Sequence, residues 1–117
     1  MRTVPKPWGR EVIFAENELY AGKILHLNAG HCLSLQYHER KDETIFVLEG
    51  QMRLQVEIDG AMQEILLGPG QSHRIRPGAR HRMRADMPCT IVEVSTPQLD
   101  DVVRLEDDYG RAGTKAP

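Results

Sequence analysis

The sequence predicts an all-β protein that forms one small domain, and three observations lead to this prediction. Short apolar or alternating runs follow one another along the 117 residues, and none keeps a helical apolar period for three turns. Gly, Pro, Asn and Asp separate these runs, as expected for short strands joined by tight turns. The chain is too short for a second domain with its own core. Closure into a barrel or sandwich would hide the edges that an open sheet leaves bare.

Six strands are expected in the first half of the chain, each an apolar or alternating run that ends at turn residues. In order they are Arg10–Ala15, Leu19–Leu27, Cys32–His38, Glu43–Leu48, Met52–Ile58 and Met62–Leu67. The turn residues that follow the second, fourth, fifth and sixth of these runs are Asn28-Ala29-Gly30, Glu49-Gly50, Asp59-Gly60 and Gly68-Pro69-Gly70. Asp59-Gly60 is the strongest hairpin signal, because both residues tolerate a positive φ.

Three more strands are expected in the second half: Ser72–Arg76, Arg80–Arg84 and Thr90–Ser95. Pro77-Gly78 supplies the turn between the first two. The apolar alternation stops after Ser95. We therefore expect the domain to span residues 1–111 and residues 112–117 to form a flexible tail.

Composition excludes several function classes. The formal net charge is -2 and both signs are spread along the chain, which argues against a nucleic-acid-binding surface. No apolar run reaches the length of a signal peptide or a membrane span, so we expect a cytoplasmic protein without a membrane partner. Cys32 and Cys89 lack the spacing of a zinc knuckle, and we expect two buried, reduced thiols.

A cluster of polar side chains on faces that should be buried indicates a metal site. Gln36 and His38 share one face of their strand, and Glu43 shares a face with apolar neighbours of the next strand. A buried carboxylate or imidazole is costly unless it is paired or bound to a metal. His81 follows a turn that could return it to the same end of a barrel. Two imidazoles, a carboxylate and an amide oxygen suit one divalent ion, with zinc our first choice and manganese, iron or nickel as alternatives.

Several motifs resemble those of one known family. Residues 30–50, with Gln36-x-His38, Glu43 and Gly50, resemble the first cupin motif, and residues 70–81 resemble the second. Two further segments are similar to the opening and closing segments of type II mannose-6-phosphate isomerase cupin domains, which often lie at the C-terminus of mannose-1-phosphate guanylyltransferases. The opening segment is Pro7-Trp8-Gly9, and the closing segment is Asp100-Asp101-x-Val103-Arg104-Leu105-Glu106-Asp107-x-Tyr109-Gly110-Arg111. The resemblance covers about residues 5–111. It implies a jelly-roll barrel, metal ligation by Gln36, His38, Glu43 and His81, a sugar-phosphate substrate, and a homodimer formed through the N-terminal strand.

The chain departs from this family at positions beside the expected ligands. Lys41 and Ile45 stand where the family commonly has an arginine and an aromatic residue, and the family's asparagine soon after the last histidine is missing. These changes indicate an altered pocket, whose substrate can differ from mannose 6-phosphate. The Gly-rich loop of a nucleotidyltransferase is also missing, so we expect no guanylyltransferase activity from this chain.

The implied reaction, an aldose-ketose interconversion through an enediol, requires a base and an electrophile. Glu93 is the first candidate base, because it faces the cavity if Val92 and Val94 pack outward, and a structural ion pair is its alternative. Lys41 and Lys23 could each hold a phosphate or an enediolate oxygen, or be surface lysines. Ser34 could contact the substrate or be a satisfied core hydroxyl.

Arg104 resembles the closing arginine of the family and could clamp a phosphate bidentately. Its alternative role is an ion pair with Asp100 or Asp107 that holds the tail.

Three function classes remain open. The first is a metal-dependent sugar-phosphate isomerase. The second is a non-catalytic module that binds a sugar or small acid through its metal centre. The third is an iron-dependent cupin dioxygenase, for which two histidines and a carboxylate would form the facial triad.

Overall fold

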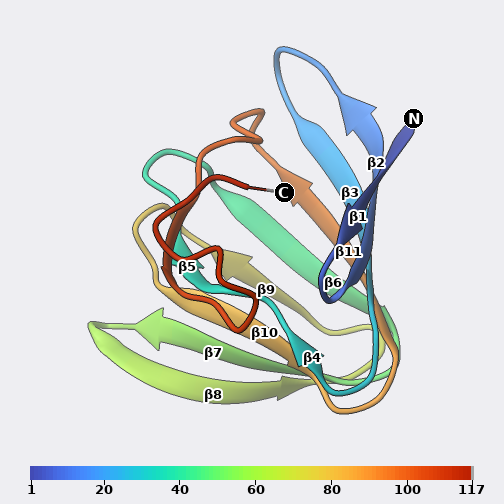
Figure 1. Cartoon of the computed structure of the whole chain (residues 1–117), viewed down its shortest axis with the longest axis vertical. Helices are drawn as coiled ribbons and strands as arrows, with labels where there is room; N and C mark the ends of the chain where they lie inside the picture. The colour runs from blue at the N-terminus through green and yellow to red at the C-terminus, as the bar shows by residue number, and fades with distance from the viewer. Residues whose placement is uncertain (117) are drawn as a thin grey trace.

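The computed structural model describes residues 1–116, and these residues form twelve strands in two antiparallel sheets. One sheet has the order β1 (Arg2–Lys6), β2 (Gly9–Glu16), β3 (Ala21–Leu27), β11 (Cys89–Ser95), β6 (Glu43–Glu49) and β9 (Ser72–Ile75). The other has the order β12 (Val103–Glu106), β5 (Leu35–Tyr37), β10 (His81–Ala85), β7 (Met52–Ile58) and β8 (Ala61–Leu67), and β4 (His31–Cys32) also pairs with β10. Figure 1 shows the sheets as the walls of a barrel. No helix within residues 1–116 is long and apolar enough to cross a membrane.

The hydrophobic core lies between the two sheets and follows the alternation of the strands. On β6, Ile45 and Val47 are fully buried while Phe46 remains exposed. On β7, Leu54 and Val56 point inward in the same way. Each such side chain contributes roughly 1.5–3 kcal/mol when it leaves water. The expected all-β barrel is therefore confirmed, and Cys32 and Cys89 are buried free thiols, as expected.

At two turns, the backbone conformation or the close packing explains which residue types are found there. Asp59 and Gly60 join β7 to β8 with φ values of 51° and 81°, which confirms the predicted hairpin. Gly9 is the first residue of β2 and has φ 153°, and a Cβ atom there would lie 1.9 Å from the carbonyl oxygen of His26. Only glycine fits at this position, because β2 approaches the backbone of β3 so closely.

The structure corrects the predicted strands at three places. β1 and β12 were not expected, because each is an outer strand of its sheet with mostly exposed or half-buried side chains and therefore lacks the apolar alternation. The single strand expected over Cys32–His38 is interrupted between β4 and β5. Both short strands pair with β10, so the break changes the pairing locally but not the neighbour.

The C-terminal segment returns to β12. The Gly113 N–H donates to the Arg104 carbonyl at 3.0 Å, and Lys115 Nζ donates to the Asp100 carbonyl at 3.2 Å. The expected tail extends to residue 117, which lies outside the described residues. Flexibility of residues 112–116 stays a prediction, since these bonds are few and mostly exposed.

Candidate metal centre and the adjoining cavity

Three side chains that sequence analysis selected as metal ligands converge inside the barrel. His38 follows β5, Glu43 begins β6 and His81 begins β10. Their potential ligand atoms all lie within 4.8 Å of one another, and each residue is at least 98% buried. His38 Nε2 lies 3.6 Å from Glu43 Oε2, and His81 Nε2 lies 3.4 Å from Glu43 Oε1. These three residues could hold a metal ion.

Hydrogen bonds on the far side of each imidazole fix its orientation. His38 Nδ1 lies 2.5 Å from the carbonyl oxygen of Asp101, and His81 Nδ1 lies 3.0 Å from that of Ala79. A carbonyl oxygen only accepts, so both Nδ1 atoms carry the hydrogen, and in a neutral ring Nε2 is left with a lone pair. Backbone carbonyls orient metal-bound histidines in this way in known metal sites.

The facing atoms form an arrangement that a positive charge between them would stabilise. His38 Nε2 and His81 Nε2 are buried and have no hydrogen-bond partner among residues 1–116, and the Glu43 carboxylate that they face has the Lys41 ammonium group on its Oε2 atom. Two lone pairs aimed at a carboxylate repel it unless a proton or a metal ion lies between them. The donor set, two imidazoles and a carboxylate, fits a divalent metal ion.

The loop between β5 and β6 places His38 and Lys41, and an aspartate from the distant closing segment holds this loop. The Asp101 carboxylate accepts the backbone N–H groups of Glu39, Arg40 and Lys41 at 2.7–3.0 Å. Its own carbonyl orients His38. Burial opposes the ionised form of Asp101, but these three N–H groups lower its pKa. Sequence analysis quoted Asp101 only within the closing segment and assigned it no role.

Gln36, the fourth expected ligand, lies beside the three converging residues. It is the Cα partner of His81 across the β5–β10 pair, so the two side chains share a face. The Ser34 hydroxyl donates to Gln36 Oε1 at 2.7 Å. An amide oxygen has two lone pairs, so Oε1 retains one for a metal ion. Ser34 is buried and lines the cavity, and its observed contact positions Gln36.

Lys41 joins the two carboxylates that sequence analysis assigned to the site. Its Nζ lies 2.9 Å from Glu43 Oε2 and 3.1 Å from Glu93 Oε2. Burial alone would lower the pKa of Lys41, but Glu93 and Glu43 raise it above its usual range. Burial would likewise raise the pKa of Glu43, but Lys41 and the two imidazoles hold it well below its usual range. The ion pair considered as an alternative for Glu93 is therefore present.

Glu93 also faces inward, as the strand parity of β11 predicted. Glu93 and Ile91 are buried, whereas Val94 is 53% exposed on the outer face. With neutral imidazoles, Glu43, Glu93 and Lys41 together carry one negative charge in excess. That excess favours a bound cation.

A second buried charge cluster lies across the cavity on β1, β2 and β3. Glu11 accepts from Lys23 at 2.6 Å and lies 3.4 Å from Lys6. Burial opposes the ionised form of Glu11, but the two ammonium groups lower its pKa. Lys23, expected to hold a phosphate, is thus already paired. Sequence analysis missed Glu11, although it shares a face with the buried Ile13, and that parity was the available signal.

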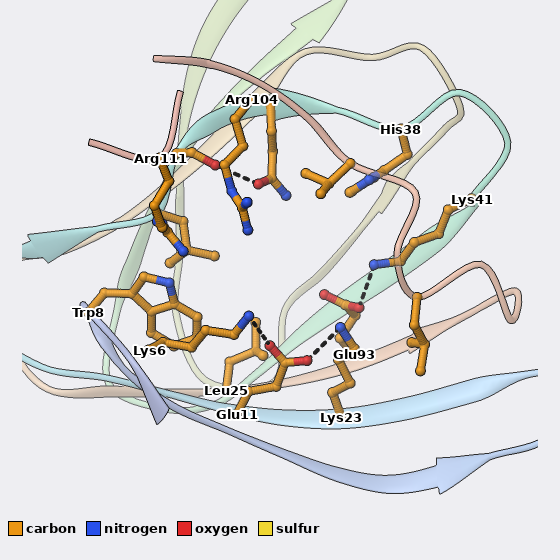
Figure 2. Close-up of a pocket in the computed structure, with 15 residues that line it drawn as sticks. Lys6, Trp8, Glu11, Lys23, Leu25, His38, Lys41, Glu93, Arg104 and Arg111 are labelled. Carbon is orange, nitrogen blue, oxygen red and sulfur yellow. Dashed lines mark hydrogen bonds and ion pairs between the residues drawn. The ribbon is translucent and has the colours of Figure 1, made fainter. Parts of the chain in front are cut away.

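Lys41 and Glu93, the Glu11 cluster, and His38 and Gln36 from the candidate metal centre line one cavity of about 80 Å³. In Figure 2, Arg104 and Arg111 enter it from one side, Lys6, Glu11 and Lys23 lie opposite, and His38, Lys41 and Glu93 close a third side. The ion pair considered for Arg104 with Asp100 or Asp107 is not formed. Arg111 pairs with Asp107 instead, at 2.9 Å, because both lie in the turn that follows β12.

Comparison with known proteins places these features in a family. The family model described as "Mannose-6-phosphate isomerase C-terminal" matches residues 1–107. The chain is 36% identical over 115 residues to mannose-1-phosphate guanylyltransferase ManC of Salmonella typhimurium, covering 94% of this chain and 23% of ManC. It thus spans about a quarter of the length of the curated relatives that it matches.

Two solved structures share the fold. KdgF from Halomonas sp. superposes with a TM-score of 0.72 at 20% identity, covering 81% of this chain and 84% of KdgF. An uncharacterized protein from Klebsiella pneumoniae with a double-stranded β-helix domain superposes with a TM-score of 0.66 at 18% identity, covering 79% of each chain. At this level of identity the likeness shows the jelly-roll fold alone.

Proposed function

Because the chain belongs to the family of mannose-6-phosphate isomerase C-terminal cupin domains, we propose that it is a metal-dependent sugar-phosphate isomerase. It would interconvert an aldose phosphate and a ketose phosphate through an enediol. The observation that supports the proposal is the buried convergence of His38 Nε2 and His81 Nε2, neither with a hydrogen-bond partner in the described residues, on the Glu43 carboxylate. Such a centre opening on a charged cavity suits the stabilisation of an enediolate.

The proposed metal ion is zinc, held by His38, Glu43, His81 and Gln36. Zinc favours four nitrogen and oxygen donors in a tetrahedral arrangement, and manganese, iron or nickel would also accept this set. When bound, the ion would act as a Lewis acid toward an oxygen of the substrate. Ser34 and the Asp101 carbonyl would keep Gln36 and His38 in place.

Glu93 is the proposed base. Its carboxylate lines the cavity and would take a proton from the carbon next to the carbonyl group, then return it to the neighbouring carbon. Lys41 would first have to release Glu93 Oε2, since its Nζ lies 3.1 Å away. The released ammonium group would donate a proton to the carbonyl oxygen of the aldose as the enediol forms, and would regain one from the neighbouring hydroxyl as that group becomes the ketone.

The experiment follows proton exchange at C2 of mannose 6-phosphate in deuterated water by NMR, with zinc-loaded protein. The wild type should exchange the proton, and Glu93→Gln should lower the rate about 100-fold or more while retaining zinc. His38→Ala combined with His81→Ala should abolish both exchange and zinc binding, whereas His73→Ala, outside the centre, should change neither. Full zinc content in the double variant would contradict the proposed site.

A non-catalytic sugar-binding module is the second candidate, and one observation favours it. Lys41 already occupies an oxygen of both Glu43 and Glu93, so neither carboxylate acts on a substrate unless Lys41 moves. Binding of a hexose or pentose phosphate without C2 exchange across a panel would support this candidate over the isomerase.

A homodimer through the N-terminal strand is also proposed. β1 is the outer strand of its sheet, and an unpaired strand edge can pair with a second copy. Light scattering tests this directly, because a monomer at working concentration would contradict it.

A further inference from the structure

The loop between β5 and β6, residues 39–42, is held by side chains that follow β11. The Asp101 carboxylate accepts the backbone N–H groups of residues 39–41 at 2.7–3.0 Å. Thr96 Oγ1 accepts the N–H group of Asp42 at 3.0 Å, and the Thr96 N–H donates back to the Asp42 carbonyl at 3.0 Å. All four consecutive N–H groups of the loop are satisfied in this way, so its position depends on where the segment after β11 lies.

The strand before this loop has the same dependence. β5 pairs with β12 at all three of its residues, Leu35–Tyr37, and with β10 at Gln36. His38 follows β5, and its Nδ1 donates to the Asp101 carbonyl at 2.5 Å. One residue of the closing segment (residues 100–111) therefore holds His38 through its carbonyl and the next three residues through its carboxylate.

The closing segment is also a wall of the cavity beside the metal centre. Val102, Arg104 and Arg111 line this cavity of about 80 Å³, and Val102 and Arg104 also line a neighbouring cavity of about 150 Å³. Sites that bind small ligands typically measure about 300–1,000 Å³. The cavity beside the metal centre is thus too small for a sugar phosphate while the closing segment stays in this position. A movement that enlarges it would also displace Asp101.

We propose that Asp101 is a positioning residue through which docking of the closing segment and metal binding are coupled. With the segment docked, Asp101 holds His38 Nε2 toward Glu43. It also holds the backbone of Lys41, whose Nζ contacts Glu43. Because linkage is reciprocal, a metal ion on His38 favours the docked segment by the same factor by which the docked segment favours metal binding. This inference rests on the metal site of the proposed function and not on the isomerase reaction.

The first test is the zinc affinity of Asp101→Ala, measured by competition with a chelator of known affinity. The variant removes the acceptor of three N–H groups but keeps the carbonyl that faces His38. Loss of a group that orients a metal-bound histidine typically costs about 10–100-fold in metal affinity, and we expect a loss in this range. Asp100→Ala is the matched control, because it removes the same charge from an exposed neighbour that contacts Lys115 through its carbonyl. It should bind zinc like the wild type.

Cobalt in place of zinc distinguishes positioning from a general loss of stability. Its visible absorption depends on the number and arrangement of its ligands, so the bands should change in Asp101→Ala at a temperature where circular dichroism shows the variant to be folded. They should not change in Asp100→Ala. Asp101→Asn keeps one acceptor oxygen and should recover part of the zinc affinity, and it is the test variant if Asp101→Ala does not fold. Wild-type zinc affinity and cobalt spectrum in a folded Asp101 variant would overturn the positioning role.

Amide hydrogen exchange of the closing segment tests the coupling. Zinc should slow the exchange of residues 100–111 in the wild type and in Asp100→Ala, because the ion favours the docked segment. The slowing should be lost in Asp101→Ala at a zinc concentration that saturates it. Equal slowing in Asp101→Ala and the wild type would overturn the coupling.

The outcomes also separate this inference from the proposed function. A wild type that binds no zinc would contradict the metal site and the coupling together. Zinc affinity that depends on Asp101, without C2 proton exchange, would support the coupling and contradict the isomerase. C2 exchange by a wild type whose zinc affinity does not depend on Asp101 would contradict the coupling alone.

Discussion

Replacing Lys41 by methionine should destabilise the metal-free protein strongly. Methionine keeps an unbranched apolar stem of similar length but removes the ammonium group that lies 2.9 Å from Glu43 and 3.1 Å from Glu93. Both carboxylates are buried, with side-chain exposures of 1% and 6%. The variant therefore retains two buried negative charges without the cation between them.

The expected size of the effect follows from these distances. At an effective dielectric constant of about 20, each contact corresponds to about 5–6 kcal/mol of gross attraction. The cost of burying Lys41 offsets much of this, and removal of one partner from a buried ion pair typically costs about 3–5 kcal/mol. With an unfolding entropy of about 2.1 cal/mol/K per residue, the melting temperature should fall by about 12–20 °C.

Urea unfolding of chelator-treated protein at pH 7 measures this loss. Lys115→Met is the control, because Lys115 is exposed and contacts only backbone carbonyls, and it should change stability by about 0.5 kcal/mol or less. A double-mutant cycle with Glu93→Gln should give a coupling free energy of at least about 1 kcal/mol. A Lys41→Met variant within about 1 kcal/mol of the wild type would refute the ion-pair reasoning.

Three further predictions concern the metal, the second charge cluster and the close turn at Gly9. Zinc at about 100 times its dissociation constant should raise the free energy of unfolding by about 2.7 kcal/mol, and a thermal shift that persists in the variant lacking His38 and His81 would contradict the site. Glu11→Gln should cost about 3 kcal/mol at pH 7, because Lys6 and Lys23 lose their carboxylate. The pKa of Glu11 is lowered by folding, so its contribution is present above about pH 4.5 and disappears as the pH falls further. Acid titration of both proteins should show the difference shrinking only there. Gly9→Ala should prevent folding, as judged by circular dichroism, because its Cβ would lie 1.9 Å from the His26 carbonyl oxygen, whereas Gly78→Ala, with open space around it, should cost only about 1–2 kcal/mol.

Much of the fold could be predicted because it depends on local patterns. The alternation in β6 and β7 and the Asp59-Gly60 turn follow from residue chemistry within a few positions. β1 and β12 could not be predicted in this way, since an outer strand buries too little to impose an apolar alternation. The break between β4 and β5 likewise has no turn residue to announce it.

For the site, the sequence by itself determined which residue types are available and which face of a strand each one occupies. It put Gln36 and His38 on one face of their strand and Glu43 on a face with apolar neighbours, because the period of two in a strand fixes which residues share a side of the sheet. The inward direction of Glu93 depended on Val92 and Val94 packing outward, and His81 was assigned from its turn and from the family resemblance. Only the tertiary structure decided which charges meet. The order of the strands and the return of the closing segment set these pairs, which are Glu11 with Lys23, Arg111 with Asp107, and Asp101 with the His38 loop. Parity carries no information about that order, so the lack of a hydrogen-bond partner for Arg104 Nε among residues 1–116 became visible only once its neighbours were known.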